Sequence, residues 1–241
     1  MNQMDAFPSG QRRKKIVKQN NIKISNFGKV GRTRILDGGH YTWTDSILEG
    51  YSESSFAASF GKVLPNSNEG MKSYIEKVLT KRKGKAVGIE FGGLGSRLFR
   101  DFTPNFFSRS IAVTLVDHRD SDGLTQREEM DKKINHSMVV GDIFSPDTYN
   151  TLNDKLNGTQ VDLIIERMAR GLEFVPVEPY TISKILQIWY SLLREGGVMF
   201  VQTPVAFNHL LEVWAQYIEK NFKGLIEIQY NNSGYNDANT S

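Results

Sequence analysis

The chain has 241 residues, of which 39% are hydrophobic and 24% charged, and its formal net charge is +3. This length and composition suit one globular α/β domain with additions, and they are not typical of a disordered or fibrous protein. The absence of cysteine excludes disulfides, cysteine-ligated zinc or iron–sulfur centres and cysteine nucleophiles. No apolar segment approaches the roughly 20 residues of a membrane-spanning helix, so we expect a soluble, intracellular protein.

Basic side chains are concentrated in residues 1–36, which contain nine lysines and arginines against one acidic residue, Asp5. The resulting local charge of +8 predicts a flexible basic tail that can contact nucleic acid or an acidic partner. A solvated tail that only aids solubility explains the same charges equally well. We expect a cytoplasmic protein, although the four consecutive basic residues at 12–15 also suit a nuclear-import signal.

Residues 37–84 are predicted to form a small helical cap before the main domain. Thr44, Asp45 or Ser46 can cap the start of a short helix. Residues 69–83 have apolar side chains at the spacing of an amphipathic helix, and the following glycine at 84 suits its C-terminal end.

Residues 85–99 have the pattern of a buried strand, a glycine turn and the start of a helix. The strand half is made of small and β-branched residues, as a strand covered on both faces requires. Gly92, Gly93 and Gly95 then allow the backbone to turn sharply and to approach a ligand. Such a turn places backbone N–H groups at the carboxyl edge of a parallel sheet, where nucleotide-like ligands bind. Glu90 precedes the turn, and the glycines lack the G-x-G-x-x-G spacing of dinucleotide-binding proteins.

Two further strands are expected next, each with an acidic residue near its carboxyl end. Residues 110–117 predict the second strand, and Asp117 lies 27 residues after Glu90. At that place a carboxylate can accept both ribose hydroxyls of a nucleoside, although a simple loop aspartate is the alternative. Residues 126–134 predict a short charged helix, and residues 137–144 predict the third strand with its exit.

The second half of the domain continues to alternate strands and helices. The predicted elements are a strand at 161–166, a long helix at 178–197 with proline in its first turn and glycine at its end, a strand at 198–202, a helix at 209–222 and a sixth strand at 225–230. Residues 231–241 are polar and turn-like, so we expect either that a seventh strand is absent or that the chain was shortened.

These elements resemble the class I S-adenosylmethionine (SAM) dependent methyltransferases over residues 85–230. Residues 90–96 are similar to motif I of that family, D/E-x-G-x-G-x-G, with the acid and the first glycine kept and the other glycines shifted. The resemblance implies a three-layer α/β/α sandwich with a Rossmann-like, mainly parallel sheet in the order 3-2-1-4-5-6. It also implies that SAM is the cofactor. The methyltransferase domain that binds SAM is expected at residues 85–231, and a polar tail is expected at 232–241.

The resemblance assigns cofactor-binding roles as well. In this family the acid and glycines of motif I face the methionine part of SAM. Residues 141–143, Gly-Asp-Ile, resemble the signature in which the aspartate accepts the adenine amine and the next side chain lies against the ring. This pairing suits the donor amine and flat apolar face of adenine. The expected cofactor-binding residues are Glu90, Gly92, Gly93, Gly95, Asp117, His118, Asp142, Ile143 and Glu166.

The resemblance does not identify a catalytic residue. Residues 167–171 follow the fourth strand, where the family often has its catalytic motif. This sequence lacks both the Asn/Asp-Pro-Pro-aromatic motif of amino methyltransferases and the carboxylate set of metal-dependent O-methyltransferases, so no metal site is expected. Glu166 is a candidate general base or a contact for the sulfonium side of SAM, and Arg167 or Arg170 could clamp an acidic acceptor. Salt-bridged structural roles explain these residues equally well.

The cap supplies further catalytic candidates, since the segment before the first strand often shapes the acceptor pocket in this family. His40, Tyr41 and Trp43 are candidates on this basis, although aromatic residues in a short lid more often serve packing. The expected reaction is methyl transfer from SAM to an oxygen or nitrogen of RNA or of a small molecule. A catalytically inactive SAM-fold subunit of a nucleic-acid or protein assembly is the alternative, and Glu90 with the glycine spacing disfavours an NAD-dependent oxidoreductase.

Overall fold

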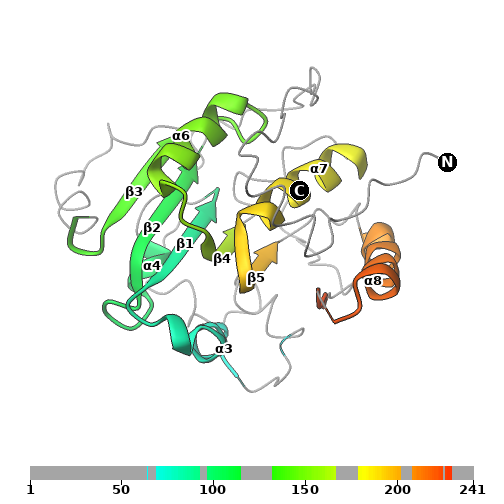
Figure 1. The fold of residues 1–241 in the computed structure, drawn as a ribbon, viewed down its shortest axis with the longest axis horizontal. Coiled ribbons are helices and arrows are strands. Elements are labelled where there is room, and N and C mark those ends of the chain that lie inside the picture. Colours follow the sequence, from blue (N-terminus) through cyan, green and yellow to red (C-terminus); the bar gives the residue numbers. More distant parts are fainter. Residues whose placement is uncertain are drawn as a thin grey trace, which may run out of the picture.

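The structure is a computed structural model of the chain, drawn in Figure 1. The residues that it describes are 64, 69–92, 97–114, 132–166, 179–201, 208–224 and 226–229. The predicted basic tail, most of the predicted cap and the polar C-terminal tail lie outside these residues. Most of the charged helix predicted at 126–134 lies outside them too.

Five parallel strands form the centre of the described fold (Figure 1). Every residue of the first and fourth strands is buried, as strands covered on both faces require. The spatial order is β3-β2-β1-β4-β5, and all four neighbouring pairs are parallel. This confirms the predicted α/β class and the order of the first five strands. The strands are β1 (Ala86–Phe91), β2 (Phe107–Thr114), β3 (His136–Val140), β4 (Val161–Glu166) and β5 (Leu193–Val201).

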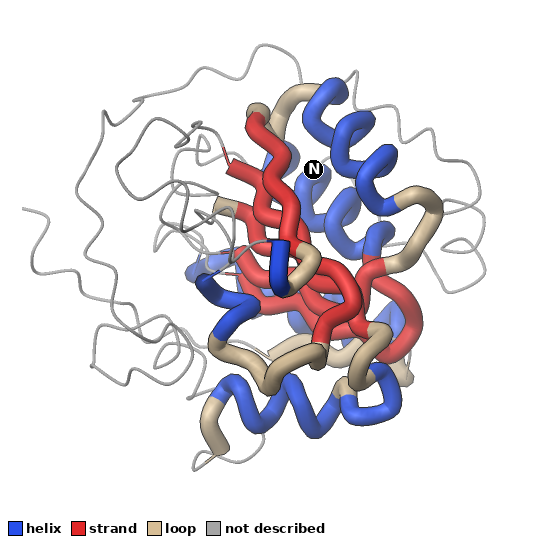
Figure 2. Tube along the Cα trace, turned by 90° about the vertical axis from the view of Figure 1, so that its left-hand side faces the viewer, coloured by secondary structure: helices blue, strands red, loops and turns tan. Residues whose placement is uncertain are grey.

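Helices lie on both sides of these strands, as Figure 2 shows. One face of the sheet forms a hydrophobic cluster with α6 (Pro146–Leu156) and α7 (Pro179–Leu192). The other face forms a cluster with α3 (Met71–Val78), the short helix α4 (Arg97–Arg100) and the residues that follow α4. A 3-10 turn, η2 (Thr80–Arg82), leads from α3 to the sheet, and α8 (Asn208–Phe222) follows β5 in the chain.

Trp189 of α7 joins both helices of the first face to the sheet. Its ring stacks on Phe91 of β1, with 4.3 Å between the ring centroids. Its Nε1 donates a hydrogen bond of 3.2 Å to the hydroxyl of Tyr149 on α6. Burial raises the pKa of Tyr149 well above its usual range, so this hydroxyl stays protonated and neutral.

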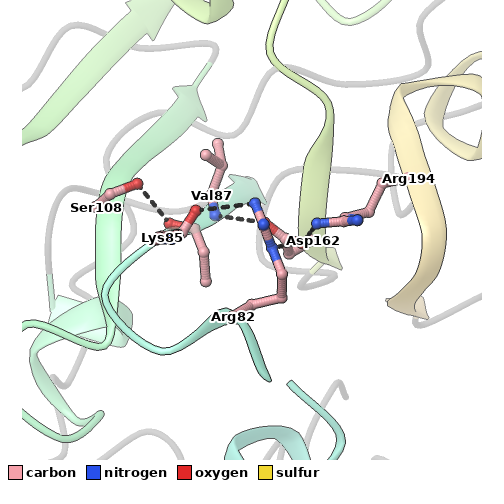
Figure 3. A network of polar contacts seen from close by, with 7 residues as sticks. Arg82, Lys85, Val87, Ser108, Asp162 and Arg194 are labelled. Atoms are coloured by element: carbon pink, nitrogen blue, oxygen red, sulfur yellow. Dashed lines mark hydrogen bonds and ion pairs between the residues drawn. The ribbon is translucent and has the colours of Figure 1, made fainter. Parts of the chain in front are cut away.

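A buried carboxylate ties three strands together at the amino edge of the sheet, where the strands begin (Figure 3). Asp162 of β4 is fully buried and accepts a hydrogen bond of 2.9 Å from the backbone N–H of Val87 in β1. Its other oxygen lies 3.1 Å from Arg82 Nε and 3.4 Å from Arg194 Nη1 of β5. Arg82 also donates to the carbonyl of Lys85, so one guanidinium fixes the turn into β1 and the start of β4.

The helix α6 was not among the predicted elements, although its ends carry ordinary capping signals. The Ser145 side chain accepts from the backbone N–H of Asp147, with Pro146 at the first helical position. At the other end Asn157 adopts the left-handed conformation, with φ of 47°. Arg109 of β2 donates hydrogen bonds to the last carbonyls of the helix. A cation is favourable at this position, because the C-terminus of a helix carries partial negative charge.

Two predicted boundaries near the end of the fold differ from the structure. The helix expected to reach residue 197 ends at Leu192, and β5 begins directly with Leu193 opposite Val161. Pairing resumes between Val198 and Leu163, so the residues between bulge outwards, with Gly196 at a φ of 75°.

The sixth strand predicted at 225–230 is not formed by the residues described there, since 226–229 belong to no strand. Ile226 and Ile228 are half-buried while Glu227 and Gln229 are exposed, and these two polar side chains share a hydrogen bond of 2.6 Å. Residues 226–229 therefore alternate between half-buried and exposed side chains without being part of a strand. An alternating sequence specifies which side of an extended segment is covered, and not whether another strand pairs with it.

No helix among the elements described above has the length and apolar character needed to cross a membrane.

Replacement of Asp162 by alanine should lower the free energy of unfolding by about 3 kcal/mol, because it leaves the buried Val87 N–H and two arginines without their shared acceptor. Urea denaturation followed by circular dichroism measures this change. The matched control is Lys77→Ala, which removes an exposed ion pair of 3.3 Å to Glu69. The control should cost less than about 0.5 kcal/mol. Equal stability of the two variants would contradict a structural role for the buried carboxylate.

Candidate functional site

The candidate site lies at the carboxyl edge of the sheet, where the parallel strands end. The strand order reverses between β1 and β4, because β1 is followed outwards by β2 and β4 by β5. Ligands of open α/β sheets bind outside the carboxyl ends at such a switch point. Five of the expected cofactor-binding residues lie in described positions at this edge: Glu90, Gly92, Asp142, Ile143 and Glu166.

The other candidates lie outside the residues that the structure describes, and their roles remain sequence predictions. They are Gly93, Gly95, Asp117 and His118 for the cofactor, and Arg167, Arg170, His40, Tyr41 and Trp43 for catalysis or the acceptor.

Gly92 begins the turn after β1 in a conformation that favours glycine. Its φ is 81°, in the left-handed region, and its N–H donates a hydrogen bond of 2.9 Å to the carbonyl of Val113 in β2. This conformation accounts for a glycine at position 92, where the backbone is still bound to the neighbouring strand.

Glu90 is fully buried at the end of β1, including both carboxylate oxygens. In the register of the sheet, Glu90 pairs with Ala112 of β2 and with Ile165 of β4. Ile165 belongs to the cluster that packs with α3, so Glu90 lies on that face of the sheet. A carboxylate in such surroundings is uncommon in a domain core and points to a specific role at this edge.

Glu166 is also fully buried, but it lies on the opposite face of the sheet. It is level with Phe91, which packs in the cluster with α6 and α7. The sequence placed Glu90 and Glu166 in one cofactor site, and the structure brings them to adjacent strand ends with their side chains on different faces. One ligand can approach both only by lying across the end of the sheet.

The Gly141–Ile143 turn after β3 has a clear role in folding. A Cβ built on Gly141 would lie 2.3 Å from Oγ1 of Thr148, so α6 approaches the turn too closely for a side chain. Asp142 accepts a hydrogen bond of 2.9 Å from the backbone N–H of Phe144 and so closes the turn locally. Ile143 packs in the cluster with α6 and α7 and is 9% exposed. These contacts account for the motif without a ligand, while half-buried Asp142 still lies at the carboxyl edge.

Sequence reasoning overlooked Thr114 at the end of β2. This residue is buried and lies two positions beyond Ala112, which is level with Glu90, so both side chains are on the same face. Its carbonyl accepts from the Gly141 N–H at 2.8 Å. A polar residue directly after the apolar residues 111–113 was the available signal. Across the described positions, no three histidine, aspartate or glutamate side chains are grouped to hold a metal ion.

The sequence matches no model of a known protein family and no curated protein. The all-parallel sheet with its helices is compatible with a Rossmann-like fold.

Substitution of Gly141 by alanine should lower the free energy of unfolding by about 1–3 kcal/mol, because the new methyl group overlaps Thr148. Adding Thr148→Ala should recover part of this loss, since it removes the hydroxyl and methyl groups that the new side chain meets. Thermal and urea unfolding of the single and double variants give the coupling between the two positions.

The control for this cycle is Thr151→Ala, one turn along α6 and exposed. It should not recover the stability of Gly141→Ala. Equal recovery by both threonine variants, or no loss from Gly141→Ala, would show that contact with Thr148 does not account for the glycine.

Proposed function

We propose that this chain is a SAM-dependent methyltransferase that binds SAM at the carboxyl edge of its sheet. The observation that supports the proposal most is the placement of three carboxylates at one edge, from Glu90, Asp142 and Glu166 at the ends of β1, β3 and β4. Glu90 and Glu166 flank the switch point of the parallel sheet, Asp142 follows the outermost strand β3, and Gly92 follows β1 in a left-handed conformation. SAM carries a sulfonium and an ammonium group, so an acidic edge favours it electrostatically.

The residues at this edge fit SAM in chemical type. The left-handed turn at Gly92 lets backbone come close to a ligand without a side chain in the way. Asp142 offers a carboxylate for an exocyclic amine, and the sequence adds Asp117 for the ribose. In the proposal the domain is a three-layer α/β/α sandwich.

Bound SAM supplies an activated methyl group, so the protein's main task is to orient the acceptor in line with it. Orientation alone can contribute roughly 7–11 kcal/mol to lowering the barrier. The missing motif after β4 therefore does not count against catalysis. In this proposal Glu166 is the candidate general base, since its carboxylate is buried at the strand end where the acceptor would bind. The acceptor is an oxygen or nitrogen of RNA or of a small molecule.

A SAM-fold subunit without catalytic activity is the second candidate. The observation that favours it is the Gly141–Ile143 turn, whose glycine, aspartate and isoleucine are all accounted for by contacts within the fold. Such a protein would keep the architecture while using its surfaces for assembly. Methyl transfer to any acceptor would decide against it.

Isothermal titration calorimetry of SAM and of its demethylated product tests the cofactor site. The intact chain should bind both, and Glu90→Gln and Asp142→Asn should each weaken binding roughly tenfold or more, because each removes a charged hydrogen-bond acceptor. Asp117→Ala tests the predicted ribose contact in the same way. The control is Asp154→Asn, an exposed position on α6 that should bind as the intact chain does.

Two other results would change the proposal. A folded intact chain that binds neither compound would contradict the cofactor site. Binding that the three site variants leave unchanged would place SAM elsewhere, and binding without turnover of any acceptor would favour the non-catalytic subunit.

A further inference from the structure

The amino edge of the sheet carries a concentration of positive charge. We define it by the described turns that lead into the strands, the first three residues of each strand and the last turn of α6. Four acidic residues lie on it: Asp101, Asp154, Asp162 and Glu195. Its nine basic residues are Lys81, Arg82, Lys83, Lys85, Arg109, Lys132, Lys133, Lys155 and Arg194. The local net charge of +5 exceeds that of the whole chain, which is +3.

Backbone hydrogen bonds hold this edge in place. In the turn before β1, Lys83 N donates to Thr80 O at 3.1 Å and Lys85 N donates to Arg82 O at 2.8 Å. Gly84 N donates to Phe106 O at 2.9 Å, which joins this turn to the segment before β2. The backbones of Lys83 and Lys85 are therefore fixed to the sheet.

The edge is also continuous from β3 to β5. Asn135, before β3, donates to the carbonyl of Ser108 at 2.6 Å, and Ser108 donates to the carbonyl of Ala86 at 3.1 Å. Arg82 and Arg194 then meet on Asp162, as Figure 3 shows. The polar contacts thus cross all five strands. With neighbouring strands about 4.8 Å apart, the edge spans about 19 Å.

The charge that faces solvent is mainly positive. Lys81, Lys83, Lys85, Lys132 and Lys133 are all exposed. Among the acidic residues, Asp162 is buried beneath its two arginines and so offsets charge only locally.

A stacking platform for unpaired bases is not part of this edge. Its aromatic residues Phe102, Phe106 and Phe107 pack edge-to-face or stacked against one another, with Phe102 and Phe106 buried. Single-stranded nucleic acid is usually held by exposed rings, whereas the phosphates of a duplex need only a row of cations. The exposed lysines lie in the turns before β1 and β3, two strand spacings or about 10 Å apart, which spans about three phosphates along a duplex whose rise is about 3.4 Å per step in each strand. The geometry therefore favours a duplex.

We propose that the amino edge binds the phosphate backbone of double-stranded nucleic acid without reading its sequence. The five exposed lysines make the phosphate contacts, and the turns before β1 and β3 present them at fixed positions. This site lies at the opposite end of the strands from the proposed SAM site, so its occupancy does not depend on SAM.

Fluorescence anisotropy of a labelled RNA duplex tests the proposal, with the full chain and no SAM present. The triple variant Lys81→Gln, Lys83→Gln and Lys85→Gln should bind more weakly than the intact chain. The slope of log K against log salt should become shallower by about 3, close to one for each lost phosphate contact. A DNA duplex of the same sequence separates the two sources of phosphate, and an equal effect on both is expected for recognition of backbone charge.

The matched control changes the net charge by the same amount at exposed lysines on α3, on α8 and just after α8: Lys77→Gln, Lys220→Gln and Lys223→Gln. It keeps the basic tail and should retain nearly the full affinity and salt slope. A second variant, Lys81→Arg, Lys83→Arg and Lys85→Arg, keeps the charge and should bind as the intact chain does. Circular dichroism shows whether each variant is folded.

Three results would overturn the proposal. One is an equal loss of affinity in the triple variant and its control, which would assign binding to net charge or to the tail. Another is tighter binding of a single strand than of the duplex. The third is competition by polyglutamate as effective as competition by unlabelled duplex, which would make an acidic polypeptide the partner.

Discussion

The fold depends on one buried charge, the carboxylate of Asp162. Its contacts with Val87, Arg82 and Arg194 hold the starts of β1, β4 and β5 together below the protein surface. A buried carboxylate is tolerated only where its partners are in place. A shift of these strands past one another would leave the carboxylate buried without its partners, at a large electrostatic cost. The register at the amino edge then determines which residues reach the carboxyl edge. The pairing of Phe91 with Glu166 at the carboxyl edge follows from this register.

The two edges of the sheet consequently differ in chemistry. Carboxylates from Glu90, Asp142 and Glu166 lie at the ends of the strands, while basic side chains predominate where the strands begin. A strand of six residues is about 20 Å long, so the two edges are separated by more than twice the Debye length, which is about 8 Å at physiological salt. A cationic cofactor and a polyanion can therefore be attracted to opposite ends of one sheet without competing for a surface.

The carboxyl edge also shows that folding and binding can use the same residues. At Gly141 a side chain would overlap Thr148, and Asp142 closes the local turn with the Phe144 N–H. A motif of this kind is required for the β3–α6 connection whether or not a ligand is present. Glu90 differs, because a short polar turn would not require a fully buried acid within β1. It is therefore the residue at this edge that most needs a functional explanation.

The sequence by itself determined the α/β class, the succession of the five strands along the chain and the bounds of β4, because continuous apolar runs and glycine turns are local properties. The sequence also contained capping signals for α6, namely Ser145 at its start and Asn157 at its end, although these were overlooked. Only the tertiary structure decided that Glu90 and Glu166 lie on opposite faces and that residues 226–229 are outside a strand. Those features depend on which strands pair and in which register. Asp162 and Arg82, 80 positions apart, meet for the same reason, since pairing joins segments whose separation no local pattern records.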